Sequence, residues 1–591
     1  MLDNKTLSNN SCHNNLEQRF NEGCSYHAGG DLSAAERAYR EVLEWRPDYV
    51  NAWISLGIVL NGLGRQIEAE ESLRKAVSID PENYYSVIHL GNVVCAQGRF
   101  QEASDYYRQA VLLNSESVEA HNNLGTSFVL LNQHAQAVEQ FRQALRLDPG
   151  YLSAAEGLSI SLVACGSYKE AVQAFDLVCR LRPGDTFVRL SLANACLGAR
   201  QYDRARMEYE LLLRANPDFA EAKGGLAATL AARGQFSKPR ALFDEALAGL
   251  SFSEHNWIFG RYAYFLLRAG EFAKGWDYYE YRWLDDSSNR ALQRRIEQPK
   301  WNGEPLKGTA LLIVSEQGLG DEIMFSSIFK EFIQETDHCI IECDERLQPL
   351  FSRSFPTATI VGVDRKQQEW CQVLEQNIHR LPPFDYWTAI GTLPRFRRRA
   401  ASEFPKHGGY LVANPDDVEC WKSRLDELGA GLKIGISWRG GTARTNSETR
   451  SLSLQQLIPI LAVKGAQFVS LQYGDCGDEI EALNSATGIT IHQMPEAGDD
   501  YDQTAALVCA LDLVISVCTA IVHLGGALGR PVWVMAPYVA EWRYGWEGSS
   551  MIWYPSVRVH RQPKLDAWAP VIADVKRALI KQMRETLSVS R

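Results

Sequence analysis

The chain has 591 residues, of which 46% are hydrophobic and 23% are charged. This composition is ordinary for soluble domains and excludes a disordered, collagenous or disulfide-dense chain, and the length suffices for about four domains. Lysine and arginine number 61 against 72 aspartates and glutamates, which gives a net charge of −11. No basic block exceeds the run Arg397 to Arg399, so nonspecific nucleic-acid binding is disfavoured.

The sequence carries no signal for secretion or for a membrane span. No apolar stretch reaches the roughly 18 residues that a membrane helix needs, and residues 1–15 are rich in asparagine and serine. The 13 cysteines are scattered and odd in number, as is typical of free thiols in a reducing compartment. Cys339 and Cys343 lack a second pair of ligands at zinc spacing. We therefore expect a cytoplasmic protein with a disordered N-terminus, 1–15, and no metal site.

A period of 34 residues dominates the first half of the chain. Prolines recur on one register, and a small residue stands ten positions after each register position. The prolines are Pro47, Pro81, Pro149, Pro183 and Pro217, and the small residues are Gly57, Gly91, Gly125, Ser159, Ala193 and Ala227. Small residues let two helices approach closely, and proline ends a helix because the residue before it resists the α conformation. Each period is therefore expected to be a helix pair, and stacked pairs share one core.

This pattern resembles the tetratricopeptide repeat (TPR) in its length and in its small, aromatic and proline positions. We assign seven repeats to residues 16–253, and a degenerate capping repeat with a linker to residues 254–300. Pro239 stands where the other repeats have alanine, so we expect a bend in repeat seven. The resemblance implies an α superhelix without chemistry of its own, whose concave face holds a protein partner.

Four asparagines of the repeats are candidates for hydrogen bonds to an extended peptide, because an asparagine side chain resembles the peptide group. The alternative is that they are ordinary exposed polar positions. They are Asn92, Asn122, Asn123 and Asn194.

From Leu306 onward, short apolar stretches alternate with helical segments. The stretches that fit buried parallel strands are 309–315, 338–343, 358–363, 432–438, 466–472, 510–516 and 531–535. An irregular stretch rich in proline and glycine, roughly 380–420, separates them into two groups. We therefore expect an α/β half with two Rossmann-like domains, whose parallel sheets face a cleft and collect ligands at the carboxyl ends of their strands.

Two turns between a strand and a helix carry the candidate chemistry. The first runs from Glu316 to Asp321, where two glycines permit close backbone approach and the helix start can hold an anion, although Asp321 could simply cap the helix. The second follows Ser516, and Thr519 would cap a helix whose first amides face the cleft. The sequence lacks the third glycine of a dinucleotide fingerprint and any Walker lysine, which argues against nicotinamide and ATP.

Residues 301–579 resemble the heptosyltransferase-like group of GT-B glycosyltransferases, in the form fused to TPR arrays in bacteria. The matching segments are WNGEPLKG, EQGLGDEIMF, ISWRGG, TRSLSL, VSLQYG, DQTAALVCALDLVISVCTAIVHLGGALGRPVWVM, WRYGW and WYPSVRVHRQ. The domains implied are an acceptor-side domain at 301–395, a linker at 396–420, a nucleotide-sugar domain at 421–567 and a C-terminal helix at 568–591. The resemblance implies an inverting sugar transfer that uses neither a metal nor another cofactor.

The resemblance also implies roles for single residues. Asp321 corresponds to the acidic residue over the acceptor hydroxyl and is expected to act as the general base, with Glu316 as the alternative carboxylate. The donor-binding candidates are Arg439, Arg450, Gln472, Tyr473, Cys518, Thr519, Ala520 and His523. The two arginines suit phosphate because a guanidinium is a permanent, bidentate donor, and a structural ion pair is the alternative for each. Trp542 and Arg543 either close the cleft or belong to the core.

Cys518 departs from the family pattern, which usually has an aspartate there to accept hydrogen bonds from the donor sugar. A thiol is uncharged and a weak acceptor, so a neutral sugar would lose an anchor. One explanation is decayed activity. The other is an anionic sugar, such as pseudaminic acid carried as its cytidine monophosphate (CMP) ester, since removal of a carboxylate relieves like-charge repulsion.

The leading hypothesis is a cytoplasmic protein O-glycosyltransferase that uses a nucleotide sugar to modify Ser or Thr of a TPR-bound protein. Flagellin is the candidate acceptor, because proteins that this chain resembles in architecture include bacterial flagellin glycosyltransferases. The alternatives are a TPR scaffold or chaperone with a relic GT-B half, and a lipopolysaccharide glycosyltransferase. The last would need a basic or amphipathic membrane-facing patch, and the sequence shows no clear one.

Overall fold

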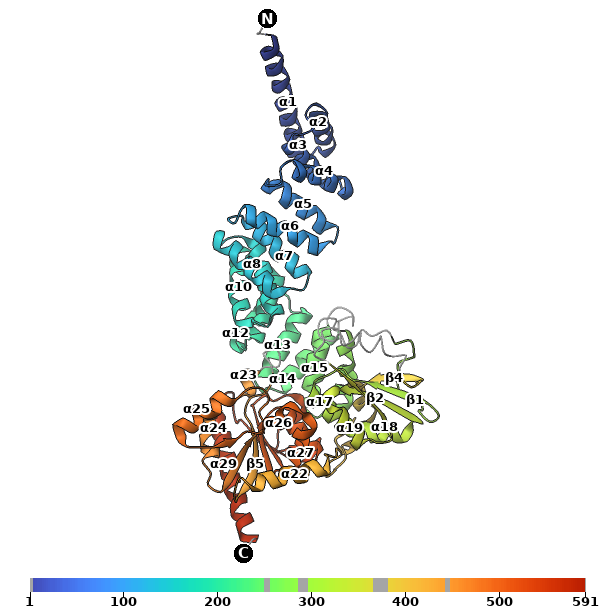
Figure 1. The fold of residues 1–591 in the computed structure, drawn as a ribbon, viewed down its shortest axis with the longest axis vertical. Helices are drawn as coiled ribbons and strands as arrows, with labels where there is room; N and C mark the ends of the chain where they lie inside the picture. Colours follow the sequence, from blue (N-terminus) through green and yellow to red (C-terminus); the bar gives the residue numbers. More distant parts are fainter. Residues whose placement is uncertain (1–3, 249–255, 285–295, 365–380, 442–446, 590–591) are drawn as a thin grey trace. The chain divides into compact units, whose positions relative to one another are not determined.

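The computed structural model describes residues 4–248, 256–284, 296–364, 381–441 and 447–589. The chain divides into two compact units, Met1–Pro217 and Asp218–Arg591. Figure 1 shows paired helices throughout the first unit, and two sheets with helices around them in the second. The fold is thus a TPR superhelix followed by an α/β region with parallel sheets, as the sequence predicts.

The first unit is built from antiparallel helix pairs in the predicted period. The pairs are α1 (Asn4–Ala28) with α2 (Leu32–Trp45), α3 (Val50–Gly62) with α4 (Gln66–Ile79), α5 (Tyr84–Ala96) with α6 (Phe100–Leu113), α7 (Val118–Leu130) with α8 (His134–Leu147), α9 (Leu152–Ala164) with α10 (Tyr168–Leu181), and α11 (Thr186–Gly198) with α12 (Tyr202–Ala215). The small residues lie where the two helices of a pair touch: a Cβ added to Gly125 would stand 2.8 Å from the ring of buried Phe141.

Of the segment 1–15 that was expected to be disordered, residues 4–15 belong to α1, and residues 1–3 lie outside the described residues. α1 has 25 residues, whereas α3 has 13. A helix that is already fixed by packing extends at little cost, since nucleation is the unfavourable step.

The second unit begins with repeat seven, α13 (Ala220–Ala232) and α14 (Ser237–Leu247), followed by the capping pair α15 (Asn256–Arg268) and α16 (Phe272–Tyr279). Pro239 is the third residue of α14, in the first turn, where a backbone N–H has no helical acceptor and its loss costs nothing. Its effect is therefore on the start of α14, and the bend of repeat seven stays a prediction.

The first sheet has strand order β3-β2-β1-β4, and all neighbours are parallel. Its strands are β1 (Ala310–Val314), β2 (His338–Asp344), β3 (Thr359–Val363) and β4 (Tyr386–Ala389), and its helices are α17 (Leu319–Phe325), α18 (Phe329–Glu335), α19 (Gln348–Ser354) and α21 (Pro394–Arg397). The sequence analysis missed β4, which has only four residues.

The second sheet has strand order β10-β11-β9-β8-β5-β6-β7, parallel except for β10. Its strands are β5 (Leu432–Ser437), β6 (Ala466–Ser470), β7 (Ile491–His492), β8 (Leu513–Val517), β9 (Val532–Ala536), β10 (Ser550–Met551) and β11 (Tyr554–Arg561). The chain leaves β5 toward β6 on one side and returns to β8 on the other, so the strand order reverses between β5 and β8. Ligands of doubly wound sheets bind at such a point.

The helices of the second sheet are α22 (Pro415–Asp426), α23 (Ser447–Arg450), α24 (Leu454–Leu461), α25 (Gly477–Thr487), α26 (Pro495–Asp499), α27 (Tyr501–Ala510), α28 (Ala520–Ala527) and α29 (Trp568–Val589). α29 coincides with the predicted C-terminal helix. The predicted linker, 396–420, is shorter than expected, because α22 begins at Pro415 with Asn414 as its cap.

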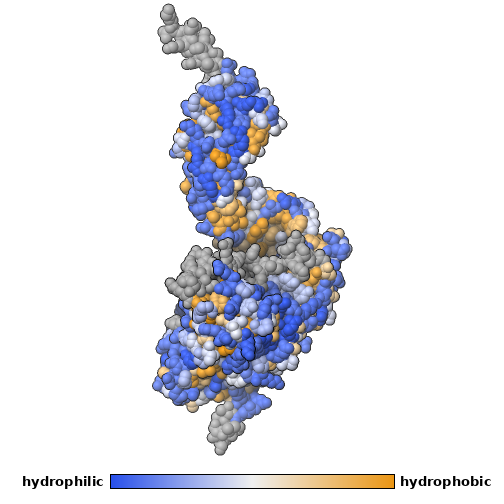
Figure 2. All heavy atoms as spheres, turned by 90° about the vertical axis from the view of Figure 1, so that its right-hand side faces the viewer, coloured by the Kyte–Doolittle hydropathy of each residue, from blue (hydrophilic) through white to orange (hydrophobic). Residues whose placement is uncertain are grey.

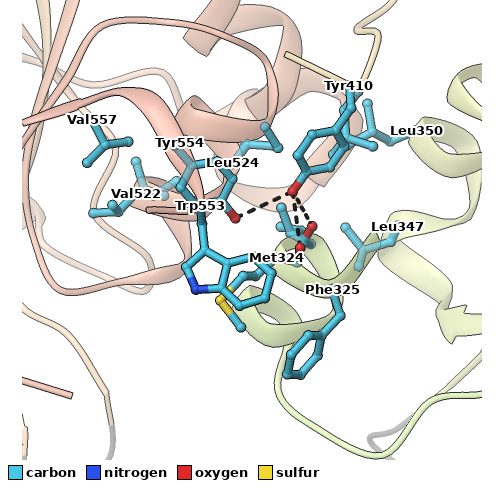
Figure 3. Packing of buried hydrophobic residues seen from close by; sticks show 14 of the residues in the cluster. Met324, Phe325, Leu347, Leu350, Tyr410, Val522, Leu524, Trp553, Tyr554 and Val557 are labelled. Carbon is cyan, nitrogen blue, oxygen red and sulfur yellow. Dashed lines mark hydrogen bonds between the residues drawn. The ribbon is translucent and has the colours of Figure 1, made fainter. Parts of the chain in front are cut away.

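One hydrophobic core joins the capping pair and both sheets. The Trp276 ring of α16 lies 5.4 Å from the Trp542 ring and 6.3 Å from the Phe325 ring of α17. Trp542 is therefore a core residue. In Figure 3, Tyr410 reaches toward α17 and toward Tyr554; its hydroxyl donates to the Ile323 carbonyl at 2.6 Å and lies 3.5 Å from the Tyr554 hydroxyl.

The face shown in Figure 2 is largely hydrophilic with separate hydrophobic patches. In the part of the chain that the structure describes, no helix is both long and apolar enough to cross a membrane.

Candidate active site

Glu316 lies in the turn after β1 and is held in the interior. Its carboxylate accepts hydrogen bonds from Arg282 Nη2 at 2.7 Å, from Arg282 Nε at 3.0 Å, and from the Gly391 amide at 2.9 Å. Arg282 follows the capping pair, in the 3-10 helix η1 (Glu280–Leu284). These partners occupy both carboxylate oxygens, so the geometry gives Glu316 a structural position and does not support its use as the alternative base.

Asp321 stands at the third residue of α17, one turn beyond Glu316. Its Oδ1 accepts a hydrogen bond from Arg543 Nε at 2.5 Å, and its side chain is 16% exposed. Oδ2 accepts no hydrogen bond from any residue that the structure describes. Burial raises the pKa of Asp321 above its usual value, against the opposing effect of the Arg543 charge. The candidate base therefore has one anchored oxygen and one available oxygen.

A chain of alternating charges connects Asp321 to the second sheet. Arg543 also donates through Nη1 to Glu541 Oε2 at 2.5 Å, and Arg450 Nη1 donates to Glu541 Oε1 at 2.5 Å. Arg450, a predicted phosphate ligand, is thus in an ion pair in this structure. Glu541 and Arg543 flank Trp542 in the loop after β9, and this proximity of residues more than 200 positions apart was not predictable from their spacing.

The two turns singled out in the sequence lie against each other. A Cβ added to Gly320 would stand 3.4 Å from Ala520 Cα and 3.1 Å from His523 Cδ2. The starts of α17 and α28 therefore meet at Gly320, where a Cβ would make tight contacts. Thr519 precedes α28 as expected, but its hydroxyl lies 3.0 Å from Ser516 Oγ and does not cap the helix.

Cys518 is buried at the end of β8. Burial raises the pKa of its thiol to about 12, and the Glu541 charge adds to the rise, so the thiol stays protonated at neutral pH. Arg450 and Arg561 act on it in the opposite direction. The thiol, a neutral and weak hydrogen-bond acceptor, is therefore surrounded by two cationic side chains and one carboxylate, that of Glu541.

His523 cannot supply a charge to a phosphate at neutral pH. It is buried, its Nδ1 lies 3.2 Å from the Tyr554 hydroxyl, and burial lowers its pKa to about 3. A neutral imidazole keeps one N–H donor, so the role of His523 toward a phosphate stays a prediction.

Three further donor-binding candidates lie together at the carboxyl ends of β5 and β6. Gln472 Oε1 accepts from the Trp438 amide at 3.0 Å and from the Arg439 amide at 2.8 Å, which ties the two strand ends together. Arg439 is paired with Glu479 at 2.7 Å. Tyr473 is 76% exposed and is the open side chain of this group.

The sequence analysis missed the contribution of the capping pair. Tyr279 of α16 accepts a hydrogen bond from Gln317, and its ring lies 5.9 Å from the Tyr264 ring of α15. Trp276 Nε1 donates to the Arg398 carbonyl at 2.7 Å. The signal in the sequence was the run of aromatic residues between Trp276 and Trp283. It indicated a capping repeat but not that this repeat packs against the turn at Gln317.

The asparagines of the first unit mostly bond to their own repeats. Asn92 Oδ1 accepts from the Tyr107 hydroxyl at 2.8 Å and from Asn123 Nδ2 at 3.0 Å, and Asn194 Oδ1 accepts from the Tyr209 hydroxyl at 2.6 Å. Asn122 is buried. Their role toward a peptide stays a prediction.

Among the described residues, no group of three or more His, Cys, Asp or Glu side chains is arranged to hold a metal ion. Cys339 and Cys343 both lie in β2 and are buried.

Comparison with known proteins identifies the helical part. Two models described as tetratricopeptide repeat match the chain, one over residues 84–150 and the other over residues 20–84, 124–186 and 190–254. Residues 20–254 contain TPR repeats. These repeats are thus an established part of the chain, and they extend into the second unit.

A curated relative is Protein FlbA of Caulobacter vibrioides, 35% identical over 329 residues. The match covers 53% of this chain and 53% of that protein. The chain therefore spans about half the length of this curated relative.

Solved structures that resemble parts of the chain include two proteins described as TPR proteins. PilF of Pseudomonas aeruginosa is 24% identical, covers 36% of this chain and 97% of its own, and has a TM-score of 0.32. A TPR protein from Parabacteroides merdae is 19% identical, with coverages of 42% and 96% and a TM-score of 0.30. YrrB, described as a TPR protein with an unusual peptide-binding site, is 21% identical, with coverages of 32% and 97% and a TM-score of 0.30.

Proposed function

We propose that this protein is a protein O-glycosyltransferase, in which the second unit transfers a sugar from a nucleotide donor to a Ser or Thr hydroxyl of a protein held by the repeats. The observation that carries the proposal is the Asp321 carboxylate. Arg543 fixes its Oδ1, while Oδ2 has no partner among the described residues. A positioned carboxylate with a raised pKa suits proton transfer from an attacking hydroxyl.

The donor is proposed to bind where the strand order reverses, between β5 and β8. Arg450 and the start of α28 lie on that side of the second sheet, and both suit a phosphate group. In the structure Arg450 is paired with Glu541. An arriving phosphate would compete with Glu541 for this guanidinium, so donor binding and the charge chain to Asp321 would be coupled.

The proposed reaction is a single displacement. The acceptor hydroxyl gives its proton to Asp321 Oδ2, and its oxygen forms a bond to the anomeric carbon. The bond from that carbon to the phosphate oxygen breaks, and the nucleotide leaves with the electron pair, stabilised by Arg450. One displacement inverts the anomeric configuration.

The donor sugar is proposed to be anionic, a nonulosonic acid such as pseudaminic acid carried by CMP, and flagellin is the proposed acceptor. The support for the sugar is electrostatic. Cys518 is neutral. Arg450 and Arg561 contribute positive potential there, and Glu541 contributes negative potential. An anionic sugar would gain from the two arginines, whereas an aspartate in place of Cys518 would oppose it.

One observation favours a scaffold with a relic sheet region as a second candidate. Arg439 and Arg450 both have carboxylate partners, and α17 packs closely on α28. A site that no longer opens would look the same.

Calorimetric titration of the full chain with CMP, and with CMP linked to a nonulosonic acid, separates the two candidates. The enzyme proposal predicts saturable binding that weakens at least tenfold in Arg450→Met and is unchanged in Arg577→Met, a matched variant of an arginine that is 75% exposed in its side chain. A relic would bind neither compound while still retaining its protein partner.

A further inference from the structure

The second unit contains a cavity of about 340 Å³ beside the candidate site. Its walls come from the turn of repeat seven at Gly234, from Arg268 of α15, from the loop 538–548 after β9, and from residues 561–563 at the end of β11. β11 lies two strands away from β8 in the sheet, which corresponds to about 10 Å. The cavity is therefore beside the Asp321 site and separate from it.

Two arginines of this cavity lack a carboxylate. Arg268 donates to the Ala231 carbonyl at 3.3 Å and stacks over the Trp546 ring at 4.2 Å. Arg561 donates through Nη2 to the Tyr544 carbonyl at 2.8 Å. Within the described ranges, no Asp or Glu oxygen comes within 4.0 Å of either guanidinium.

Several N–H donors of the cavity walls are buried without an acceptor. They are Arg268 Nε, Arg561 Nε, Arg561 Nη1 and Gln562 Nε2. Gln562 is 3% exposed, and its Oε1 is already used by the Tyr538 amide at 3.0 Å. Buried donors of this kind cost free energy unless an acceptor arrives, and buried charges cost more.

The electrostatics point the same way. Burial and, to a smaller extent, the neighbouring Arg561 charge together lower the pKa of Arg268 to about 10. Burial also lowers the pKa of Arg561. The other buried arginines of this unit behave differently, since Arg282 is paired with Glu316 and Arg543 with Asp321. The cavity lining contains one acidic residue, Glu547, which acts on Arg561 through its charge but forms no ion pair with Arg268 or Arg561 among the described residues.

We propose that this cavity binds an oxyanion, a phosphate or carboxylate group of a small molecule, held by Arg268, Arg561 and Gln562. Guanidinium groups give oxyanions charge-assisted, geometrically defined hydrogen bonds, and Trp546 offers an apolar wall beside them. The assignment does not depend on Asp321, because none of the three residues contacts it, although Arg561 also contributes to the potential at Cys518.

The site would also connect the cap to the loop that holds the candidate base. Arg268 belongs to α15, and loop 538–548 carries both Glu541 and Arg543. An anion bound to Arg268 and Arg561 would hold this loop against the cap. Occupancy is therefore expected to stabilise the second unit as a whole.

The test is a titration of the full chain with inorganic phosphate at constant ionic strength, followed by the melting temperature of the second unit and by Trp fluorescence. Sodium chloride is the control for general salt effects. We expect a saturable, phosphate-specific rise in melting temperature, with affinity at least tenfold weaker in Arg268→Met and in Arg561→Met. Arg577→Met is the matched control and should respond as the unmodified chain does. Asp321→Asn should also bind phosphate normally, which separates this site from the catalytic proposal.

A second variant keeps the test decisive if either methionine variant folds poorly. Gln562→Glu retains the oxygen that accepts from Tyr538 and adds a negative charge beside the arginines. It should raise the melting temperature in phosphate-free buffer and abolish the response to phosphate. The proposal is overturned if phosphate gives no saturable shift, or if Arg561→Met and Arg577→Met respond equally.

A parallel titration with CMP and with acetate identifies the source of the oxyanion. Binding of CMP that depends on Arg561 and excludes inorganic phosphate would assign the cavity to a nucleotide phosphate. Binding of acetate with the same dependence would assign it to a carboxylate. Both results support the site.

Discussion

Arg282 and Glu316 form a buried, two-pronged ion pair that joins the end of the capping helices to the first turn after β1. Their side chains are 7% and 0% exposed. The pair therefore fixes the segment after the capping helices against the turn that leads to Asp321.

Glu316→Gln should strongly destabilise the second unit, because it leaves the Arg282 charge buried without its main partner. Loss of one member of a buried ion pair costs about 3–5 kcal/mol. The measurement is denaturant unfolding of the second unit, with Glu316→Gln, Arg282→Met and the double variant in one cycle. The double variant should be more stable than Glu316→Gln alone; equal stabilities would show that the pair is not coupled.

The pH dependence of transfer should report Asp321. The base must be ionised to accept a proton, and burial raises its folded pKa, so activity should fall with falling pH at a higher pH than an ordinary aspartate gives. His523 should not contribute to this limb above pH 4, because its pKa is lowered to about 3. The profile of kcat/KM against pH checks both statements. An acid limb centred at or below the ordinary aspartate value near pH 4 would contradict the role of Asp321.

The capping pair should be indispensable for folding of the sheets. Trp276 and Tyr279 are buried in the same core as α17 and Trp542, so a chain that begins at residue 301 would expose this surface. We expect a chain of residues 218–591 to fold with one cooperative transition and a chain of residues 301–591 to be unfolded or aggregated. Circular dichroism and limited proteolysis distinguish these results, and cooperative folding of 301–591 would refute the expectation.

Two glycines in helices should respond in opposite ways to alanine. Gly125→Ala places a Cβ 2.8 Å from the Phe141 ring, and overpacking of this kind costs about 1–3 kcal/mol. Gly260→Ala in α15 meets no heavy atom within 4 Å, and the higher helix propensity of alanine should stabilise by about 1 kcal/mol. Thermal unfolding of the corresponding unit measures each effect. Stabilisation by Gly125→Ala would show that the helix pair has room at this contact.

The repeat architecture was readable because each signal recurs at the same phase. Gly57, Gly91 and Gly125 all stand where a neighbouring helix comes close, so the period gives both the helix pair and its contact. The sheet strands were readable where they form unbroken apolar runs. β4 and β7 were missed because they are short, and β11 because exposed and buried residues alternate along it.

The site was only partly predictable. Strand-turn-helix logic placed the turns that precede α17 and α28 at the cleft, and the family resemblance singled out Asp321, Ala520 and His523. The structure brings the starts of the two helices together at Gly320. The partners that decide the chemistry of the site were not predictable, since Arg543 and Arg282 reach their carboxylates through tertiary packing. The boundary between the two units lies after Pro217 and was not predictable either, because the repeat pattern continues across it with the same period.

The most direct test of the account is the intact mass of an acceptor protein, flagellin first, incubated with the full chain and a CMP-linked nonulosonic acid. The account predicts a mass increase equal to whole sugar residues with the unmodified chain and none with Asp321→Asn, although that variant still binds the acceptor. A mass increase with Asp321→Asn would remove the assigned base. No increase with the unmodified chain, on flagellin and on every protein that the repeats retain, would contradict sugar transfer and favour the scaffold.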